Sequence, residues 1–315
     1  MATLLRSTLV LLVILAAAPL RAQSPAPAPA PVPIPFSTTP ATPPTAASRD
    51  AEYHAAWNEA EQTAIRGPAS IALRDQAKLA LPAGMVFLPQ ATAARLSRAM
   101  GNQASASLVG IVTNFSDADS WIVFINWTAD GYIRDDDAKD LNPDDILENL
   151  TEGTVEGNKD RLARGFPEIN LKGWTQRPEY NVVTHRLSWS LRVVPKDEPD
   201  GGSVNFNTRA LGREGYFGLN LIDKPELIEK DRPVSALLLA NLEYNEGKRY
   251  TDFNASTDHV AEYGLAALLG VVALKKLGLI ALAGAFVLKF AKVGFLAVVG
   301  VGLGLKRFFR RKPGA

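Results

Sequence analysis

The sequence predicts an α+β fold with a mostly antiparallel sheet flanked by helices, followed by a C-terminal transmembrane helix. Patterns typical of strands come in consecutive runs that helical patterns interrupt, and the two do not alternate strictly. Glycine and proline turns separate several of these runs, as they do in hairpins. After Glu262 the chain has no acidic residue and is largely apolar, which is typical of a membrane segment.

Two segments precede the predicted domain. Residues 1–22 are typical of a signal peptide, with Arg6 ahead of an apolar run and Ala22 at a passable cleavage site. An uncleaved signal anchor is the alternative, because Leu20 stands where a small residue is preferred. Residues 23–47 are rich in proline, alanine, serine and threonine, and therefore predict an extended linker without a core.

The folded domain is predicted over residues 48–257. Its first element is a helix from Arg49 to Ile65, which Gly67-Pro68 ends. Short strands over 71–81 and 85–88 and a helix over 91–100 follow. Segments 108–115 and 121–127 are apolar on both faces, which predicts strands near the centre of a sheet.

A second long helix is predicted to begin at Asn142, because a proline and two aspartates follow this N-cap residue. Gly153 and Gly157 are predicted to break this helix before it reaches Arg164.

Residues 181–194 alternate more regularly than any other segment and predict a strand. Its apolar face comprises Val183, His185, Leu187, Trp189, Leu191 and Val193, and its polar face comprises Thr184, Arg186, Ser188, Ser190 and Arg192. We therefore expect His185 to be buried, with its ring nitrogens hydrogen-bonded. Strands over 204–211 and 216–223 flank a hairpin connection at 212–215, and a helix that opens at Pro225 is interrupted at Pro233.

The C-terminal segment is predicted as a juxtamembrane helix over 258–276, a transmembrane anchor over 277–305 and a basic cytoplasmic tail over 306–315. The anchor contains Lys289 and Lys292, which either extend toward the lipid headgroups or contact a protein or lipid partner. The positive-inside rule and the signal peptide then place the domain in the bacterial periplasm, attached to the inner membrane.

The charge distribution bears on the partners. Between Gln23 and Glu262 there are 23 basic and 33 acidic residues, and an acidic domain of this kind argues against nucleic acid as a partner. The lipid bilayer is an expected partner, together with an envelope protein or a second copy held through the anchor. The absence of cysteine excludes disulfides and thiolate chemistry.

Two groups of polar residues are candidates for a binding surface. Asp135, Asp136 and Asp137 predict a solvated acidic loop, with a cation site as the alternative. Arg209, Arg213 and Glu214 either pair with one another or bind an anion. No nucleophile elbow, phosphate loop or dinucleotide fingerprint is present, so we assign no catalytic residue, metal site or cofactor.

Several motifs resemble those of one protein family. They are Gly173-Trp174, Pro178-x-Tyr180, His185-Arg186-Leu187-x-Trp189, the run from Asn205 to Tyr216, and Asp258-x-Val260-Ala261-x-Tyr263-Gly264. The family is domain of unknown function 2167, a group of membrane-anchored bacterial proteins. The sequence departs from the family at Phe206, where tyrosine is usual. The resemblance implies architecture and topology but no catalytic residues, and the order of elements also resembles photosystem subunit P and Mog1.

These observations favour a non-enzymatic, membrane-anchored periplasmic domain that binds a protein or envelope component. An oligomeric membrane assembly built through the anchor is an alternative hypothesis. A hydrolase that uses His185 with a nearby carboxylate is another. An open cleft that holds His185 beside an acid or an arginine would favour the enzyme.

Overall fold

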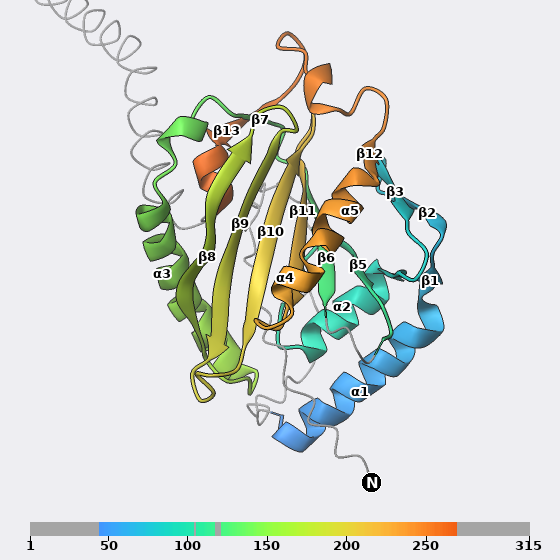
Figure 1. Cartoon of the computed structure of the whole chain (residues 1–315), viewed down its shortest axis with the longest axis vertical. Helices are drawn as coiled ribbons and strands as arrows, with labels where there is room; N and C mark the ends of the chain where they lie inside the picture. The colour runs from blue at the N-terminus through green and yellow to red at the C-terminus, as the bar shows by residue number, and fades with distance from the viewer. Residues whose placement is uncertain (1–43, 104, 117–120, 270–315) are drawn as a thin grey trace, which may run out of the picture. The chain divides into compact units, whose positions relative to one another are not determined.

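The computed structural model describes residues 44–103, 105–116 and 121–269 and confirms the α+β class. Eight strands form one antiparallel sheet in the order β1-β4-β5-β6-β11-β10-β9-β8 (Figure 1). In that order the strands are Ile65–Arg66, Val86–Pro89, Leu108–Thr113, Ile122–Thr128, Tyr216–Asp223, Ser203–Leu211, Arg186–Pro195 and Ile169–Asn181. The predicted central strands are therefore β5 and β6, and β6 lies fourth of the eight.

Two smaller sheets and several helices complete the fold. An antiparallel sheet has the order β12-β3-β2, and a parallel pair joins β13 to β7. These strands are Leu242–Tyr244, Ala77–Leu81, Ala69–Leu73, Val260–Gly264 and Tyr132–Arg134. The helices are α1 (Ala46–Thr63), α2 (Gln90–Ala99), η1 (Ala138–Asp140), α3 (Pro143–Ala163), α4 (Ile228–Asp231), α5 (Pro233–Ala240), η2 (Tyr250–Asp252) and η3 (Leu265–Leu269).

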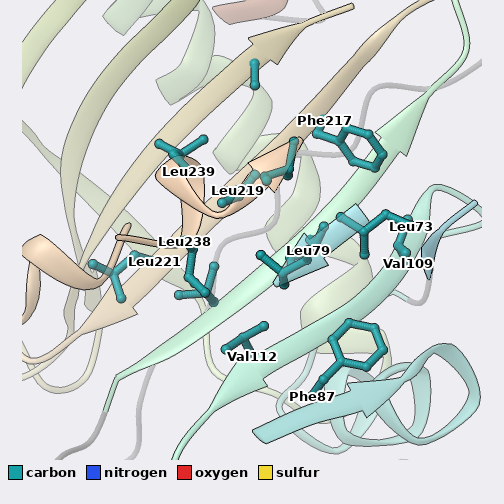
Figure 2. Close-up of a cluster of buried hydrophobic side chains, with 14 of the residues drawn as sticks. Leu73, Leu79, Phe87, Val109, Val112, Phe217, Leu219, Leu221, Leu238 and Leu239 are labelled. Carbon is teal, nitrogen blue, oxygen red and sulfur yellow. The ribbon is translucent and has the colours of Figure 1, made fainter. Parts of the chain in front are cut away.

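One face of the large sheet packs against α5 and the β12-β3-β2 sheet. Leu238 and Leu239 of α5 and Leu79 of β3 meet Phe217 and Leu219 of β11 in this core (Figure 2). Burying a leucine or phenylalanine side chain contributes roughly 1.5–3 kcal/mol. Leu242 of β12 and Ala210 of β10 belong to the same cluster, so this core positions β12 near the end of β10.

The opposite face is covered by two groups of elements. Successive residues of a strand point to opposite faces, so Phe124 of β6 contacts α1 and α2 while Val123 belongs to the first core. Farther along the sheet, α3, β7, β13 and η3 cover the second face around Trp189 and Leu191 of β9.

Helix α3 corrects one prediction, because it continues through Gly153 and Gly157 to Ala163. Its buried residues are Ile146, Leu150, Thr154, Asn158 and Arg161. This spacing keeps one continuous face against β8. The packing of that face outweighs the roughly 1 kcal/mol that each glycine costs in a helix.

Strand β8 was not predicted, because its period is broken. Register shifts interrupt its pairing with β9 between Leu171 and Gly173, and again between Trp174 and Glu179. Each bulge moves the following side chains to the other face of the sheet. The sequence therefore shows no sustained alternation in this segment.

The C-terminal predictions are only partly covered by the structure. Residues 260–264 form strand β13 and residues 265–269 form η3, where a juxtamembrane helix was expected. Within the described ranges, no helix is long and apolar enough to cross a membrane. The predicted signal peptide, nearly all of the linker, the anchor with Lys289 and Lys292, and the basic tail lie outside the described residues.

Candidate functional site

The turn between β8 and β9 places His185 differently from the prediction. The Asn181 side chain accepts hydrogen bonds from the backbone N–H groups of Val183 and Thr184, both at 3.0 Å. This local arrangement ends β8, as asparagine often does in turns, and β9 begins only at Arg186. Val183 is consequently 85% exposed.

His185 itself is not in the core, so the expectation that it is buried in a strand was wrong. Its φ is +50°, in the left-handed region that few residues other than glycine adopt. The alternation predicted for this strand holds only from Leu187 onward, through Trp189 to Val193. The side chain of His185 is 23% exposed and lines an open pocket.

The pocket has a volume of about 160 Å³. We call it the His185 pocket. Its more polar part is lined by Thr184, His185, Arg186, Arg249, Tyr250 and Thr251. The remaining lining residues are Ala210, Leu211, Leu242 and Tyr244.

Sheet register brings these segments together. Arg186 of β9 pairs with Ala210 of β10, and an isolated bridge pairs Gly212 with Arg249. The two arginines thus come from chain segments more than 60 residues apart and meet at the ends of β9 and β10. Backbone hydrogen bonds between the paired strands set the spacing of the two segments that carry these arginines.

The His185 pocket is lined by two arginines and a histidine, and no carboxylate is among its described lining residues. Arg186 donates from Nη2 to the Leu239 carbonyl oxygen at 2.9 Å, and burial lowers the pKa of Arg186. Arg249 is exposed, and its guanidinium has no ion pair or hydrogen bond within the described part of the chain. Such a lining favours an anion.

Behind the pocket, His185 lies beside an acid and a tyrosine, with its Nδ1 3.7 Å from Oδ2 of Asp135. The Tyr180 hydroxyl donates to Asp135 at 2.6 Å and lies 3.2 Å from Nδ1 of His185. Burial, and then the hydrogen bond to Asp135, raise the pKa of Tyr180 well above its ordinary value. Tyr180 therefore keeps its proton at neutral pH.

A stack of aromatic rings holds the imidazole in place. The centroids of the His185 and Tyr250 rings are 4.2 Å apart, and Tyr132 stacks on Tyr250 at 4.4 Å. The Tyr250 hydroxyl donates to the Ile133 carbonyl oxygen at 2.8 Å. These contacts restrict rotation of the His185 ring.

The chain matches the model of the family "Protein of unknown function (DUF2167)" over residues 65–302. The chain belongs to this family. No curated protein matches it. One similar solved structure is the solution structure of cyanobacterial PsbP (CyanoP) from Synechocystis sp. PCC 6803, with 8% identity, a TM-score of 0.35, and coverage of 58% of this chain and 91% of that chain.

Arg213 and Glu214, in the family motif, do not pair with each other as one alternative expected. Arg213 forms two hydrogen bonds of 2.7 Å to Asp258, and Glu214 accepts two of 2.7 Å from Lys248. We call Arg213, Glu214, Lys248 and Asp258 the turn clasp. It attaches the segment after β12 to the connection between β10 and β11.

The pKa values of the two acids in the turn clasp are both lowered, as expected for carboxylates paired with cations. The hydrogen bonds from Arg213 hold the pKa of Asp258 well below its ordinary value. Those from Lys248 lower the pKa of Glu214. Every charge in the clasp is satisfied within the fold, so these residues are better explained by structure than by ligand binding.

Arg209 lies on the opposite face of the sheet from Ala210 and is separate from both groups. Its guanidinium carbon lies 5.0 Å from the ring centroid of Trp189 and 5.8 Å from that of Tyr216. Burial lowers its pKa, and its buried Nε has no hydrogen-bond partner in the described part of the protein. Cation–π contacts with the two rings replace the expected ion pair.

The three consecutive aspartates diverge, as adjacent side chains in a loop do. Asp135 accepts from Tyr180, whereas Asp137 accepts from the backbone N–H groups of Leu265 and Ala266. Asp136 is exposed. Among the residues that the structure describes, no group of acids and histidines could hold a metal ion.

Several residues of the site were missed by sequence reasoning. Arg186 was assigned to the polar face of a strand, and Arg249 and Tyr250 lie in a short segment without a recognisable motif. The one usable signal was Asn181 four residues before His185, because asparagine commonly forms turns. It would have ended the predicted strand and exposed the histidine.

Proposed function

We propose that this protein is a periplasmic domain anchored in the bacterial inner membrane, and that it binds a small anion in the His185 pocket. The anchor and the location are supported by the sequence patterns at the two ends of the chain. Anion binding is supported by the lining of the pocket. It contains Arg186, Arg249 and His185, and no aspartate or glutamate is among the described residues that line it.

The pocket is the observation that carries the proposal. An acidic domain repels anions at long range. A locally basic pocket on such a domain therefore supports specific anion binding at that place. Arginine binds carboxylate and phosphate oxygens with two parallel N–H donors. Arg249 has such a guanidinium exposed and without an acceptor in the described structure.

Binding can be measured on the full-length protein in detergent by titrating inorganic phosphate and then acetate. We expect saturable binding of at least one of them, and Arg249→Gln should weaken it by about tenfold, the loss of one charge-assisted hydrogen bond. Arg98→Gln is the matched control, because Arg98 is exposed on α2 and does not line the pocket. Equal weakening by both substitutions would reject the pocket as the site.

The topology is tested separately. A reporter that is active only in the periplasm should work when fused after Leu242 and fail when fused after Ala315. This outcome follows from the basic tail, which the positive-inside rule retains in the cytoplasm. Activity at both positions would reject a single transmembrane segment.

Hydrolysis is a second candidate function. One observation favours it: His185 lines an open pocket beside Arg186, and its Nδ1 lies 3.7 Å from Oδ2 of Asp135 and 3.2 Å from the Tyr180 hydroxyl. Such contacts orient a general base. The test is hydrolysis of p-nitrophenyl acetate and p-nitrophenyl phosphate by the wild type and by His185→Asn. Equal rates for the two proteins would exclude this candidate for those ester classes.

A further inference from the structure

The hydrogen-bond chain behind the pocket determines which nitrogen of His185 carries the proton. Tyr180 has a single hydroxyl proton, and it uses this proton to donate a hydrogen bond of 2.6 Å to the Asp135 carboxylate. Toward His185 the tyrosine oxygen can then only accept. Because it lies 3.2 Å from Nδ1, the neutral imidazole must carry its proton on Nδ1.

The other ring nitrogen is then an acceptor. Nε2 of neutral His185 has a lone pair and no proton. In the described structure it has no hydrogen-bond partner, and it is not among the buried atoms left unpaired, so it is open to solvent. The pocket therefore combines two guanidinium donors with one exposed acceptor.

We propose that the His185 pocket selects an oxyanion that carries a hydroxyl group beside its charge, such as a hydroxycarboxylate or hydrogenphosphate. Arg249 and Arg186 bind the charged oxygens, and Nε2 of His185 accepts a hydrogen bond from the hydroxyl group. Tyr180 and Asp135 are positioning residues, because they act through the histidine. This inference rests on anion binding at the pocket and adds the chemical class of the ligand.

Two matched pairs of ligands test the acceptor. Lactate differs from propionate by one hydroxyl group, and phosphate near neutral pH retains an O–H group that sulfate lacks. The full-length wild type should bind lactate about tenfold more tightly than propionate, or phosphate about tenfold more tightly than sulfate, since one hydrogen bond contributes about this factor. A preference for lactate alone would identify hydroxycarboxylates as the ligand class, and a preference for phosphate alone would identify phosphates.

His185→Asn should abolish the preference while leaving part of the anion affinity. Among residues other than glycine, asparagine is one of those that best tolerate a positive φ, so the turn at +50° is retained. Its shorter side chain does not reach the position of Nε2. Equal binding within both pairs by the wild type would overturn the inference. That outcome differs from failure of the proposed function, in which none of the four anions binds in a manner that depends on Arg249.

A measurement without ligand tests the positioning residues. In full-length protein with ¹⁵N-labelled histidine, NMR should show one of the three histidines with its proton on Nδ1, whereas histidine in water prefers Nε2. The signal should be absent in His185→Asn. It should revert to the Nε2-protonated form when Tyr180→Phe is combined with Asp135→Asn, because Oδ2 of Asp135 lies 3.7 Å from Nδ1 and can accept its hydrogen bond once the tyrosine hydroxyl is gone. A wild-type His185 protonated on Nε2 would contradict the inference.

Discussion

Two neighbouring residues of one segment have opposite surroundings. Lys248 belongs to the turn clasp, and its ammonium lies 2.7 Å from Glu214 and 3.6 Å from Asp75. Arg249 belongs to the His185 pocket, and its guanidinium has no ion pair among the described residues, although its backbone N–H donates to Oδ2 of Asp252 at 3.0 Å. Both cations are brought to the same end of the large sheet, so proximity alone does not decide their roles. The difference lies in whether the fold itself supplies the counter-charge.

This comparison separates structural charges from available ones. Exposed ion pairs contribute about 0–1 kcal/mol each, but the Arg213–Asp258 pair has two parallel hydrogen bonds, and the Asp258 side chain is only 10% exposed. The clasp therefore stabilises the segment that leads to Arg249. The clasp lies next to the pocket along the chain, but the two have no residue in common.

The largest effect is expected from Arg213→Gln, which removes one partner of a pair that is mostly buried. We expect Tm to fall by several degrees, because the Asp258 carboxylate loses its counter-charge and two of its four described hydrogen-bond donors. Affinity for the anion should stay within about twofold at temperatures where the protein is folded. Thermal denaturation and titration of the same sample measure both.

Arg177→Gln is the control for this substitution. Arg177 also pairs with an aspartate, Asp144 at 3.5 Å, but its side chain is 65% exposed. Its removal should change Tm by less than about one degree. If both substitutions lower Tm by the same amount, the Arg213–Asp258 pair stabilises the fold no more than an ordinary exposed ion pair does.

The second effect is the pH dependence of the clasp. The pKa of Asp258 is lowered by folding from its ordinary value of 3.8, so the carboxylate stabilises the fold above that pH. This stabilisation is lost as pH falls through the lower folded pKa. The difference in stability between the wild type and Asp258→Asn should therefore be constant near pH 7 and shrink below about pH 4. A difference that grows on acidification would contradict the assigned direction of the pKa shift.

A smaller effect is expected from Arg209→Met, at a cation that resembles Arg249 in lacking an acid. Burial of an unpaired guanidinium is costly, and an apolar residue of similar volume often replaces a buried charge without loss of stability. We expect Tm to be unchanged or slightly raised, because methionine can retain contact with the rings of Trp189 and Tyr216. A loss as large as that of Arg213→Gln would show that the two cation–π contacts stabilise the fold as strongly as an ion pair.

The sequence predicted the parts of the fold that depend on local pattern. Strands β5, β6, β10 and β11 were found because apolar runs and turns mark them directly. The bulged strand β8 was missed, and α3 was ended too early, because pairing with distant segments outweighed local preferences. The site was missed for the same reason. Its arginines meet only through the register of β9 with β10 and the bridge between Gly212 and Arg249.

The smallest effect concerns the acidic loop of Asp135, Asp136 and Asp137, two of whose carboxylates accept hydrogen bonds within the fold. Asp135 accepts from Tyr180, and Asp137 accepts from two backbone N–H groups at the start of η3, so neither is oriented as a calcium ligand. Calcium at millimolar concentration should therefore change the Tm of the full-length protein by less than about one degree, relative to chelator. A true site would add about 2.7 kcal/mol at a hundredfold excess over its Kd, which corresponds to a rise of several degrees for a domain of this size. Such a rise, if Asp136→Asn abolished it, would place a cation site in the loop and show that its exposed aspartate is available in the same sense as Arg249.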